Sequence, residues 1–162
     1  MAQKILIFKN FYFFIFFFIF TYSAYGEIIS GKAKVIDGDT ISINSSKIRL
    51  HGIDAPELDQ KCLYEKKQWS CGQDSKYFLK NLIYKNILNC KTKGKDKYKR
   101  YIAVCYLEDI NINQELVKSG WAIAYKYYSK DYIRDEKIAK DNKNGIWKGE
   151  FIEPYIYRKN NK

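Results

Sequence analysis

The sequence has one histidine, His51, and none of its four cysteines is separated from another by two residues. Protein zinc sites are usually built from closely spaced cysteines and histidines, so this pattern argues against a zinc site. Phenylalanine is also scarce after residue 26, where only Phe78 and Phe151 remain. A core formed by that part must therefore rely on Ile, Leu, Val, Tyr and Trp. There are no internal repeats, and 162 residues suffice for one domain.

The first 26 residues have the features of a secretory signal peptide. Lys4 and Lys9 give a positive start, residues 11–20 are an unbroken apolar run, and Ala24 and Gly26 are small residues suited to a cleavage site. An uncleaved membrane anchor is the alternative, but a spanning helix needs about 20 apolar residues. We therefore expect cleavage after Gly26 and a secreted or periplasmic protein without a membrane span.

Acidic residues are the minority among charged side chains, with 18 Asp and Glu against 29 Lys and Arg. The net charge is +11, and it is +9 without the leader, which holds two lysines and no acidic residue. Such a charge favours polyanions such as nucleic acid, or an anionic membrane surface. A lysine-rich composition that serves solubility explains it equally well, so charge alone does not decide the function.

The four cysteines, Cys62, Cys71, Cys90 and Cys105, all follow the leader. An even number in an exported chain favours disulfides, with free buried thiols as the alternative. Of the three possible pairings we favour Cys62–Cys71 and Cys90–Cys105. The second pair is symmetric about a turn-like, lysine-rich stretch at 93–99, where a hairpin would bring the two thiols together.

Residues 27–157 are expected to form one domain, followed by a basic disordered tail at 158–162. Hydrophobic patterning predicts about five short strands and three helices, and a polar, irregular segment from Leu58 to Gly72. We expect the helices to begin near Asp74, Asn113 and Ser129. This tally favours a mainly β fold with helices (α+β) and an OB-type barrel, while an α+β sandwich fits the strand count equally well.

Two nearby segments carry acidic residues that could hold a cation. Asp39 lies in the turn-like sequence Asp-Gly-Asp-Thr at 37–40, and Asp54 follows a predicted strand. Carboxylates from two segments, together with a main-chain carbonyl such as that of Ala55, are suitable ligands for Ca²⁺. The alternative is that the aspartates of the turn bind local N–H groups. The second acidic segment favours a metal site formed by Asp39, Asp54 and Ala55.

Three other residues have side chains suited to phosphodiester chemistry. Glu57 could orient or deprotonate a water molecule. Arg49 could bind a phosphate with two hydrogen bonds, and Arg100 could add positive charge where negative charge develops in the transition state. The plainer alternatives are a loop glutamate, a cation on a strand and a solvated lysine-rich turn.

Lys97, Tyr98, Tyr125 and Tyr127 are candidate contacts to nucleic acid. Tyrosines can stack on unpaired bases, which favours single-stranded or frayed DNA and RNA as partners. Tyrosine is also the main large core residue of this chain, so packing is the alternative role.

Distinctive motifs follow one another in order at residues 35–40, 48–57, 96–100, 116–122 and 145–147. Together they resemble the staphylococcal nuclease (thermonuclease) family. The similarity extends over residues 28–147, and the cysteine-bearing insert resembles a secreted bacterial subgroup. The sequence has Lys99 where the family usually has a glycine before its arginine, and residues 125–128 align only with a gap.

The resemblance implies an OB-like five-stranded barrel with three helices, and Ca²⁺-dependent cleavage of DNA and RNA that leaves 3′-phosphates. It implies that Glu57 acts on the attacking water and that the two arginines bind the phosphate. The catalytic positions would be Arg49, Glu57 and Arg100, and the calcium ligands would be Asp39, Asp54 and the carbonyl of Ala55.

We therefore expect an exported, monomeric, calcium-dependent nuclease, which is a hydrolase of ester bonds. The main alternative is a catalytically inactive OB-fold protein that binds nucleic acid. Such a protein would not need Glu57 or the two aspartates, and acidic residues facing a phosphate groove would weaken simple binding. A calcium-stabilised surface protein without a substrate is a third possibility.

Overall fold

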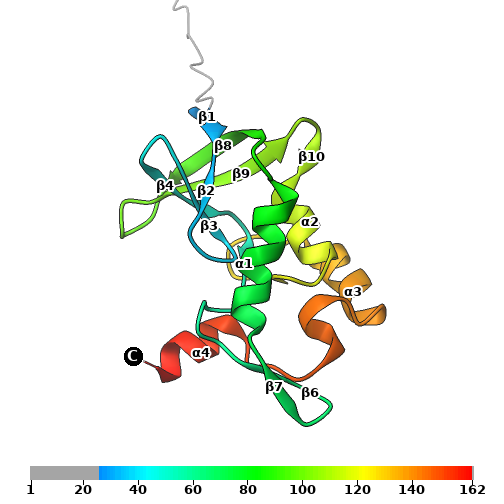
Figure 1. The fold of residues 1–162 in the computed structure, drawn as a ribbon. Helices are drawn as coiled ribbons and strands as arrows, with labels where there is room; N and C mark the ends of the chain where they lie inside the picture. Colours follow the sequence, from blue (N-terminus) through cyan, green and yellow to red (C-terminus); the bar gives the residue numbers. More distant parts are fainter. Residues whose placement is uncertain (1–25, 162) are drawn as a thin grey trace, which may run out of the picture.

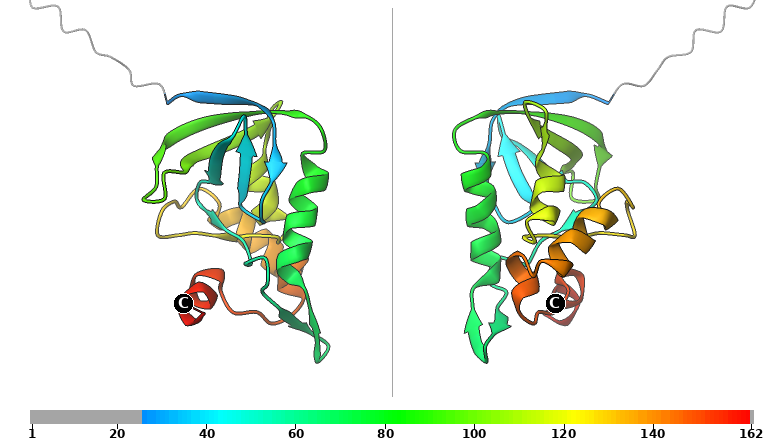
Figure 2. Two further views of the ribbon diagram at one scale, coloured as in Figure 1. Left: turned by 60° about the vertical axis from the view of Figure 1, so that its left-hand side comes forward. Right: turned by 90° about the vertical axis from the view of Figure 1, so that its right-hand side faces the viewer.

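The computed structural model describes residues 26–161, so the predicted signal peptide at 1–26 lies outside the described part except for its last residue. The described part contains eleven strands, four α-helices and one 3₁₀ helix (Figure 1). Two further views show most strands gathered at one end of the molecule, with helices and a small hairpin at the other (Figure 2). Within residues 26–161, no helix is long and apolar enough to cross a membrane.

A seven-stranded sheet curls on itself to form the barrel. Its order is β1-β8-β9-β4-β3-β2, and β10 pairs with β9. Strands β4 and β9 are parallel, whereas the other pairs are antiparallel. Only Ala33 separates β1 from β2, so one short chain segment joins the two ends of this order. The bounds are β1 Ile28–Lys32, β2 Lys34–Val35, β3 Thr40–Ile43, β4 Ser46–Leu50, β8 Ile87–Lys95, β9 Tyr101–Leu107 and β10 Ile110–Asn111.

The prediction of a mixed α+β fold with an OB-like barrel is confirmed. The expected five strands correspond to the segments β1/β2, β3, β4, β8 and β9. The additional strands form two small sheets, one of β5 (Ile53–Asp54) with β11 (Ile123–Ala124) and one of β6 (Cys62–Tyr64) with β7 (Lys67–Trp69). The prediction of an irregular segment at 58–72 is therefore wrong for the hairpin β6–β7.

The barrel encloses an aliphatic core. Ile41, Ile43, Ile48 and Leu50 are buried at alternate positions of β3 and β4, because successive side chains of a strand point to opposite faces. Leu79 and other apolar residues of the helices close this core. Phe78 and Phe151 are only partly buried and pack against the cores from outside.

The helices start a few residues away from the predicted positions. Ser70, rather than Asp74, is the N-cap of the first helix, and Asp74 lies in its first turn. Asn111 caps the second helix, while the buried side chain of Asn113 binds the main chain of β9. The Ser129 hydroxyl accepts a hydrogen bond from a nearby main-chain N–H in a turn that precedes the third helix. These helices are α1 Cys71–Leu82, α2 Ile112–Lys118 and α3 Ile133–Asp141.

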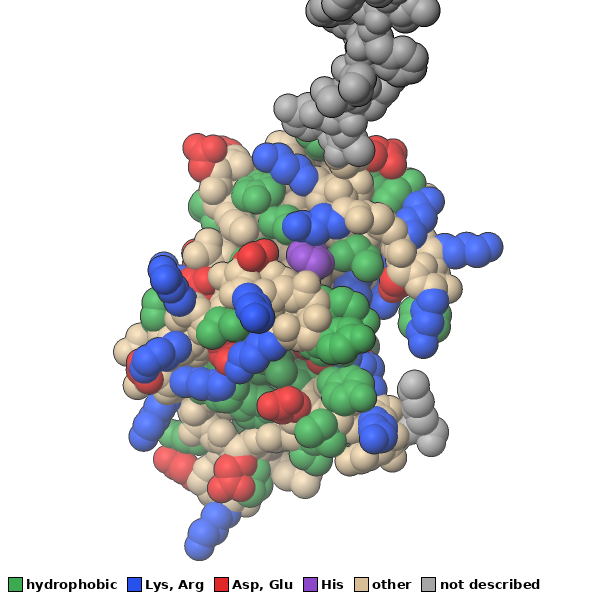
Figure 3. All heavy atoms as spheres, turned by 180° about the vertical axis from the view of Figure 1, so that it is seen from behind, with side chains coloured by type: hydrophobic (Ala, Val, Ile, Leu, Met, Phe, Trp, Pro, Cys, Tyr) green, Lys and Arg blue, Asp and Glu red, His purple; other side chains and the backbone are tan. Residues whose placement is uncertain are grey.

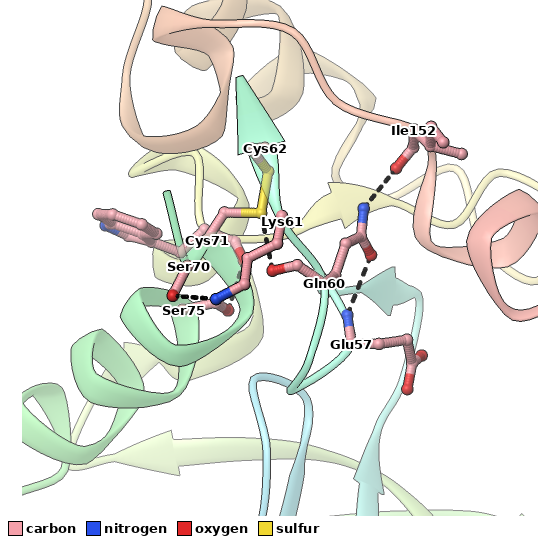
Figure 4. The surroundings of a disulfide bond; sticks show 9 residues. Glu57, Gln60, Lys61, Cys62, Ser70, Cys71, Ser75 and Ile152 are labelled. Atoms are coloured by element: carbon pink, nitrogen blue, oxygen red, sulfur yellow. Dashed lines mark hydrogen bonds between the residues drawn. A yellow bond between two sulfur atoms is a disulfide. The ribbon is translucent and has the colours of Figure 1, made fainter. Parts of the chain in front are cut away.

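The C-terminal segment is ordered. It forms a 3₁₀ helix (Gly145–Lys148) and helix α4 (Pro154–Asn160), so the predicted disordered tail is wrong for residues 158–160. Two hydrogen bonds of 2.8 Å pair the main chain of Glu150 with that of Leu63. Buried Gln60 donates from Nε2 to the carbonyl oxygen of Ile152 at 2.7 Å (Figure 4). These contacts hold the segment against the loop that precedes β6.

Both predicted disulfides are present. Cys62–Cys71 joins β6 to the start of α1, and its surroundings are shown in Figure 4. Cys90–Cys105 links directly opposite positions of β8 and β9. The favoured pairing is therefore confirmed, and within residues 26–161 no cysteine remains free.

The Cys90–Cys105 bond should stabilise the barrel. Its cysteines lie 15 positions apart in the sequence. A cross-link of that span lowers the conformational entropy of the unfolded chain and so stabilises the folded state by about 3 kcal/mol. Replacing both cysteines with alanine is expected to lower the free energy of unfolding by about 2–4 kcal/mol, measured by urea denaturation without reductant. Adding a reductant should then destabilise the variant less than the natural protein. An unchanged unfolding midpoint in the variant would contradict a stabilising role.

Candidate active site

A cleft of about 980 Å³ lies between the barrel, the β8–β9 turn and helix α4. It brings together eight of the ten predicted site residues from distant parts of the chain. Asp54 is fully buried and contacts two of the lining arginines, and Tyr127 lies outside the lining with 84% of its surface exposed. The predicted residues that line the cleft are Asp39, Arg49, Ala55, Glu57, Lys97, Tyr98, Arg100 and Tyr125.

Positive side chains are not confined to this cleft. Figure 3 shows the face opposite to that of Figure 1, where Lys and Arg side chains are scattered among acidic and hydrophobic ones. The charge pattern of that face therefore does not by itself indicate a nucleic-acid site. The arrangement of side chains inside the cleft is more specific.

Arg49 connects the two aspartates among the three predicted metal ligands. Residues 40 and 49 are partners in the β3–β4 ladder, which places Asp39 and Arg49 close together. Arg49 donates from Nη1 to Asp39 Oδ1 at 2.8 Å and from Nη2 to Asp54 Oδ1 at 2.7 Å. Burial alone would lower the pKa of Arg49, but the two carboxylates outweigh it and raise the pKa. The guanidinium thus holds both aspartates in one place.

Asp39 is also held by two further donors. The Thr40 hydroxyl donates to Oδ1 at 3.0 Å, and the main-chain N–H of Ala55 donates to Oδ2 at 3.2 Å. Asp37 has the alternative role that the sequence analysis gave to the aspartates of this turn, which is to bind a local N–H group. Its Oδ1 accepts a hydrogen bond from the N–H of Asp39 at 3.1 Å. Burial and the charge of Asp39 raise the pKa of Asp37 to about 6. Negative charge is thus concentrated at this end of the cleft.

Asp54 binds a second arginine that sequence reasoning missed. Arg158 of α4 donates to Asp54 from Nη1 to Oδ1 at 2.8 Å and from Nη2 to Oδ2 at 3.0 Å. Its Nη1 also donates to Glu57 Oε1 at 2.6 Å. Burial raises the pKa of Asp54, and the hydrogen bonds and charges of the two arginines oppose that rise. The two arginines therefore favour the ionised form of this buried carboxylate.

Glu57 sits on a fixed loop with its side chain reaching solvent. Its main-chain N–H donates to the side-chain oxygen of Gln60 at 3.1 Å, and Gln60 is fully buried (Figure 4). Pro56, immediately before it, is buried as well. The Glu57 side chain is 34% exposed. A rigid backbone and an accessible carboxylate are what a group that acts on a water molecule requires.

Arg100 is oriented by Asp96, which the sequence analysis did not single out. Asp96 Oδ2 accepts from Arg100 Nε at 2.8 Å and from Nη2 at 2.7 Å. Asp96 Oδ1 accepts from two main-chain N–H groups of the same turn. Lys99 has a φ of 64°, the left-handed conformation that favours glycine. The turn thus keeps a glycine-like shape with lysine in the glycine position, and Arg100 lines the cleft.

Tyrosine rings line part of the cleft. The rings of Tyr125 and Tyr128 meet edge to face with centroids 4.9 Å apart, and Tyr155 of α4 lies 6.5 Å from Tyr125. Buried Glu136 accepts a hydrogen bond from the N–H of Ala124 at 3.2 Å and so holds the strand that leads to Tyr125. Tyr128 and Tyr155 therefore join Tyr125 as surfaces on which a base could stack.

The predicted metal site offers oxygen ligands only. Within residues 26–161, no group of three or more His, Cys, Asp and Glu side chains is arranged to hold an ion. The predicted set contains only two such side chains, Asp39 and Asp54, and adds a main-chain oxygen at Ala55. All three are hard oxygen donors, and Ca²⁺ accepts carboxylate, carbonyl and water oxygens in irregular shells. These residues therefore have the ligand chemistry that a hard divalent cation requires.

Comparison with known proteins decides the family. Residues 47–149 match the model of the family described as staphylococcal nuclease homologue. The chain belongs to the staphylococcal nuclease family. This nuclease is a hydrolase that acts on the ester bonds of nucleic acid. The match includes Arg49, Glu57 and Arg100, whereas Asp39 precedes it and Arg158 follows it.

Individual relatives agree with the family. An uncharacterized endonuclease of Haemophilus influenzae is 39% identical in an alignment 137 residues long that covers 80% of this chain and 72% of the relative. The succinoglycan biosynthesis protein ExoI of Rhizobium meliloti is 35% identical, covering 76% of this chain and 67% of its own length. A micrococcal nuclease of Shigella flexneri is 28% identical, with 85% and 82% covered.

Proposed function

We propose that the protein is an exported, monomeric, calcium-dependent endonuclease that cleaves DNA and RNA and leaves 3′-phosphates. The observation that carries this proposal is that Arg49 and Glu57, from one short segment, meet Arg100, from the distant β8–β9 turn, in one cleft. Two oxygen-donating aspartates accompany them. A site for simple nucleic-acid binding would not need these carboxylates, which would repel the phosphate backbone.

In the proposed mechanism, Asp39, Asp54 and the Ala55 carbonyl would hold a Ca²⁺ ion, whose charge would stabilise the phosphate as negative charge develops. Glu57 accepts a proton from the attacking water. Arg49 and Arg100 bind the phosphate oxygens and stabilise the transition state, because fixed positive groups in a cleft cost no reorganisation during the reaction. Cleavage releases the 5′-oxygen of the following nucleotide, so the phosphate stays on the 3′ side.

The substrate contacts proposed outside the reacting phosphate are aromatic and basic. Tyr125 would stack on a base, and Lys97 and Tyr98 on the opposite turn would contact the strand, since all three line the cleft. Tyr127, by its exposed position, would contact only a longer strand that leaves the cleft. Stacking on faces of unpaired bases favours single-stranded or frayed substrates.

The proposed compartment is the periplasm or the exterior of the cell. The two disulfides support it, because such bonds form and persist in oxidising compartments. Calcium is also more abundant outside the cytoplasm, and weak extracellular sites have dissociation constants of about 10⁻⁴–10⁻³ M.

The decisive experiment incubates the purified protein with single-stranded DNA, double-stranded DNA and RNA, with Ca²⁺ or with a chelator. We expect cleavage in Ca²⁺, faster cleavage of single strands, and no cleavage with the chelator. Product ends should resist extension by a polymerase until a phosphatase removes the 3′-phosphate. Cleavage that is indifferent to chelation would refute the calcium dependence, and binding without cleavage would favour the inactive OB-fold alternative.

A further inference from the structure

The inference concerns Arg158, the arginine of α4 that contacts the proposed calcium and catalytic carboxylates. It lies beyond residues 47–149, the part that matches the family. The side chain is 29% exposed, and it lines the cleft. It contacts Asp54 and Glu57 across 104 and 101 residues of chain. The cleft thus receives a cationic group from a segment outside the matched residues.

The contacts of Arg158 use acceptor positions that a metal ion would need. A carboxylate has about four lone-pair positions, two on each oxygen. Asp54 Oδ1 accepts from both Arg49 and Arg158, so both of its positions are filled. Oδ2 accepts from Arg158 Nη2 and keeps one free position. Arg158 thus takes two of the three filled positions of the buried proposed ligand.

The position of Arg158 is set by the main chain around α4. Isolated helices shorter than about 12–15 residues are marginal in water, and α4 has seven residues, so tertiary contacts must hold it. Pro154 at its first turn is buried, and Gln60 binds the carbonyl oxygen of Ile152 just before it. The same Gln60 side chain accepts from the N–H of Glu57. One buried amide therefore connects the loop of Glu57 with the segment that delivers Arg158.

We propose that Arg158 and the divalent cation compete for Asp54, so that α4 occupies the active site until the ion displaces its guanidinium. This inference rests on the proposed function, since it concerns the same metal ligands. Without the ion, Arg158 neutralises Asp54 and Glu57. With the ion bound, two like charges would share one buried carboxylate at short range, which is unfavourable where water is excluded. Arg158 therefore weakens cation binding and sets the concentration at which the site fills.

The test is Ca²⁺ binding to the full mature protein, measured by calorimetry without substrate. The Arg158→Ala variant is expected to bind Ca²⁺ about tenfold to a hundredfold more tightly, the factor that corresponds to one hydrogen bond between charged groups. Arg134→Ala is the matched control. It removes the same charge from an exposed position of α3 that forms no ion pair within residues 26–161, and it should bind Ca²⁺ like the natural protein.

A conservative variant guards against misfolding. Arg158→Gln keeps the aliphatic part of the side chain and a polar end but is shorter and removes the charge, so it should also bind Ca²⁺ more tightly. Unchanged or weaker binding in both folded variants would overturn the proposal, since weaker binding would mean that Arg158 positions the carboxylates for the ion. If the natural protein and both variants all fail to bind Ca²⁺, the proposed calcium dependence fails together with this inference, whereas equal binding in all three defeats the inference alone.

Hydrogen exchange gives a second measurement that does not depend on affinity. Amides of α4 in the natural protein should exchange faster after Ca²⁺ is added, because the ion breaks the contacts that Arg158 makes with the barrel. In Arg158→Ala they should already exchange fast and respond little to the ion. Slower exchange of α4 on addition of Ca²⁺ to the natural protein would contradict displacement.

Discussion

Replacing Glu57 with glutamine is expected to lower the turnover number on DNA by about 10²–10⁴-fold, the range that positioned proton transfer contributes. Glutamine cannot accept the proton of the attacking water, but its oxygen can still accept the hydrogen bond from Arg158 Nη1. The loop itself should persist, because Gln60 binds the main chain of residue 57 rather than its side chain. Single-turnover cleavage of a labelled oligonucleotide in saturating Ca²⁺ measures the effect.

Glu65→Gln is the matched control for this prediction. Glu65 is exposed at the turn of hairpin β6–β7 and loses the same charge without touching the cleft. Its turnover should equal that of the natural protein. Urea denaturation should give similar unfolding free energies for both variants. A Glu57→Gln variant that is folded and turns over normally would remove Glu57 from the proposed mechanism.

The part of the site that the sequence could predict is the part set by local structure. The short turn between β3 and β4 fixes their register, and this register brings Arg49 next to Thr40 and Asp39. Asp54 and Ala55 follow within a few residues, so their positions relative to Arg49 are restricted by the chain itself. In the β8–β9 turn, lysine adopts the backbone conformation of the missing glycine, and the orientation of Arg100 comes from Asp96.

The elements that the sequence did not reveal depend on distant contacts or unusual turns. The hairpin β6–β7 turns at Glu65 and Lys66, both with positive φ, where Asn-Gly or Asp-Gly is the usual signal. Helix α4 is short and basic, which is why its end resembled a disordered tail. It is ordered by Gln60, by the pairing of Glu150 with Leu63 and by the ion pairs of Arg158. No local pattern encodes such contacts.

The strands that the sequence predicted and helix α4, which it did not, are held in place by different kinds of contact. Strands β3 and β4 pair along their length and bury one face, and this arrangement appears in the sequence as apolar residues at every second position. The position of α4 results from packing against a segment about 90 residues earlier, since Gln60 and Ile152 are 92 positions apart. The proposed metal ligands thus lie in the part of the fold that the sequence predicts, whereas the residue proposed to compete with the metal lies in a segment that local patterns do not predict.

Replacing Arg49 with lysine is expected to lower the turnover number by about 10²–10³-fold, the loss typical of removing one donor that stabilises transition-state charge. Lysine keeps the positive charge but presents a point charge, whereas the guanidinium reaches Asp39 from one nitrogen and Asp54 from the other. The rate of cleavage in saturating Ca²⁺ measures this loss. The control is Arg134→Lys, which makes the same substitution at an exposed position of α3. Normal turnover of a folded Arg49→Lys variant would exclude Arg49 from phosphate binding.

Arg49→Ala should add a loss of stability that the lysine variant largely avoids. Removing one partner of a buried ion pair costs about 3–5 kcal/mol, because a buried charge is left uncompensated. We expect the lower end of this range, since Asp54 keeps Arg158 and the Arg49 side chain is 18% exposed. Added Ca²⁺ should restore part of the loss in urea denaturation by replacing the missing cation between the two aspartates. If Arg49→Ala is as stable as Arg134→Ala without the ion, Arg49 does not hold the two carboxylates together.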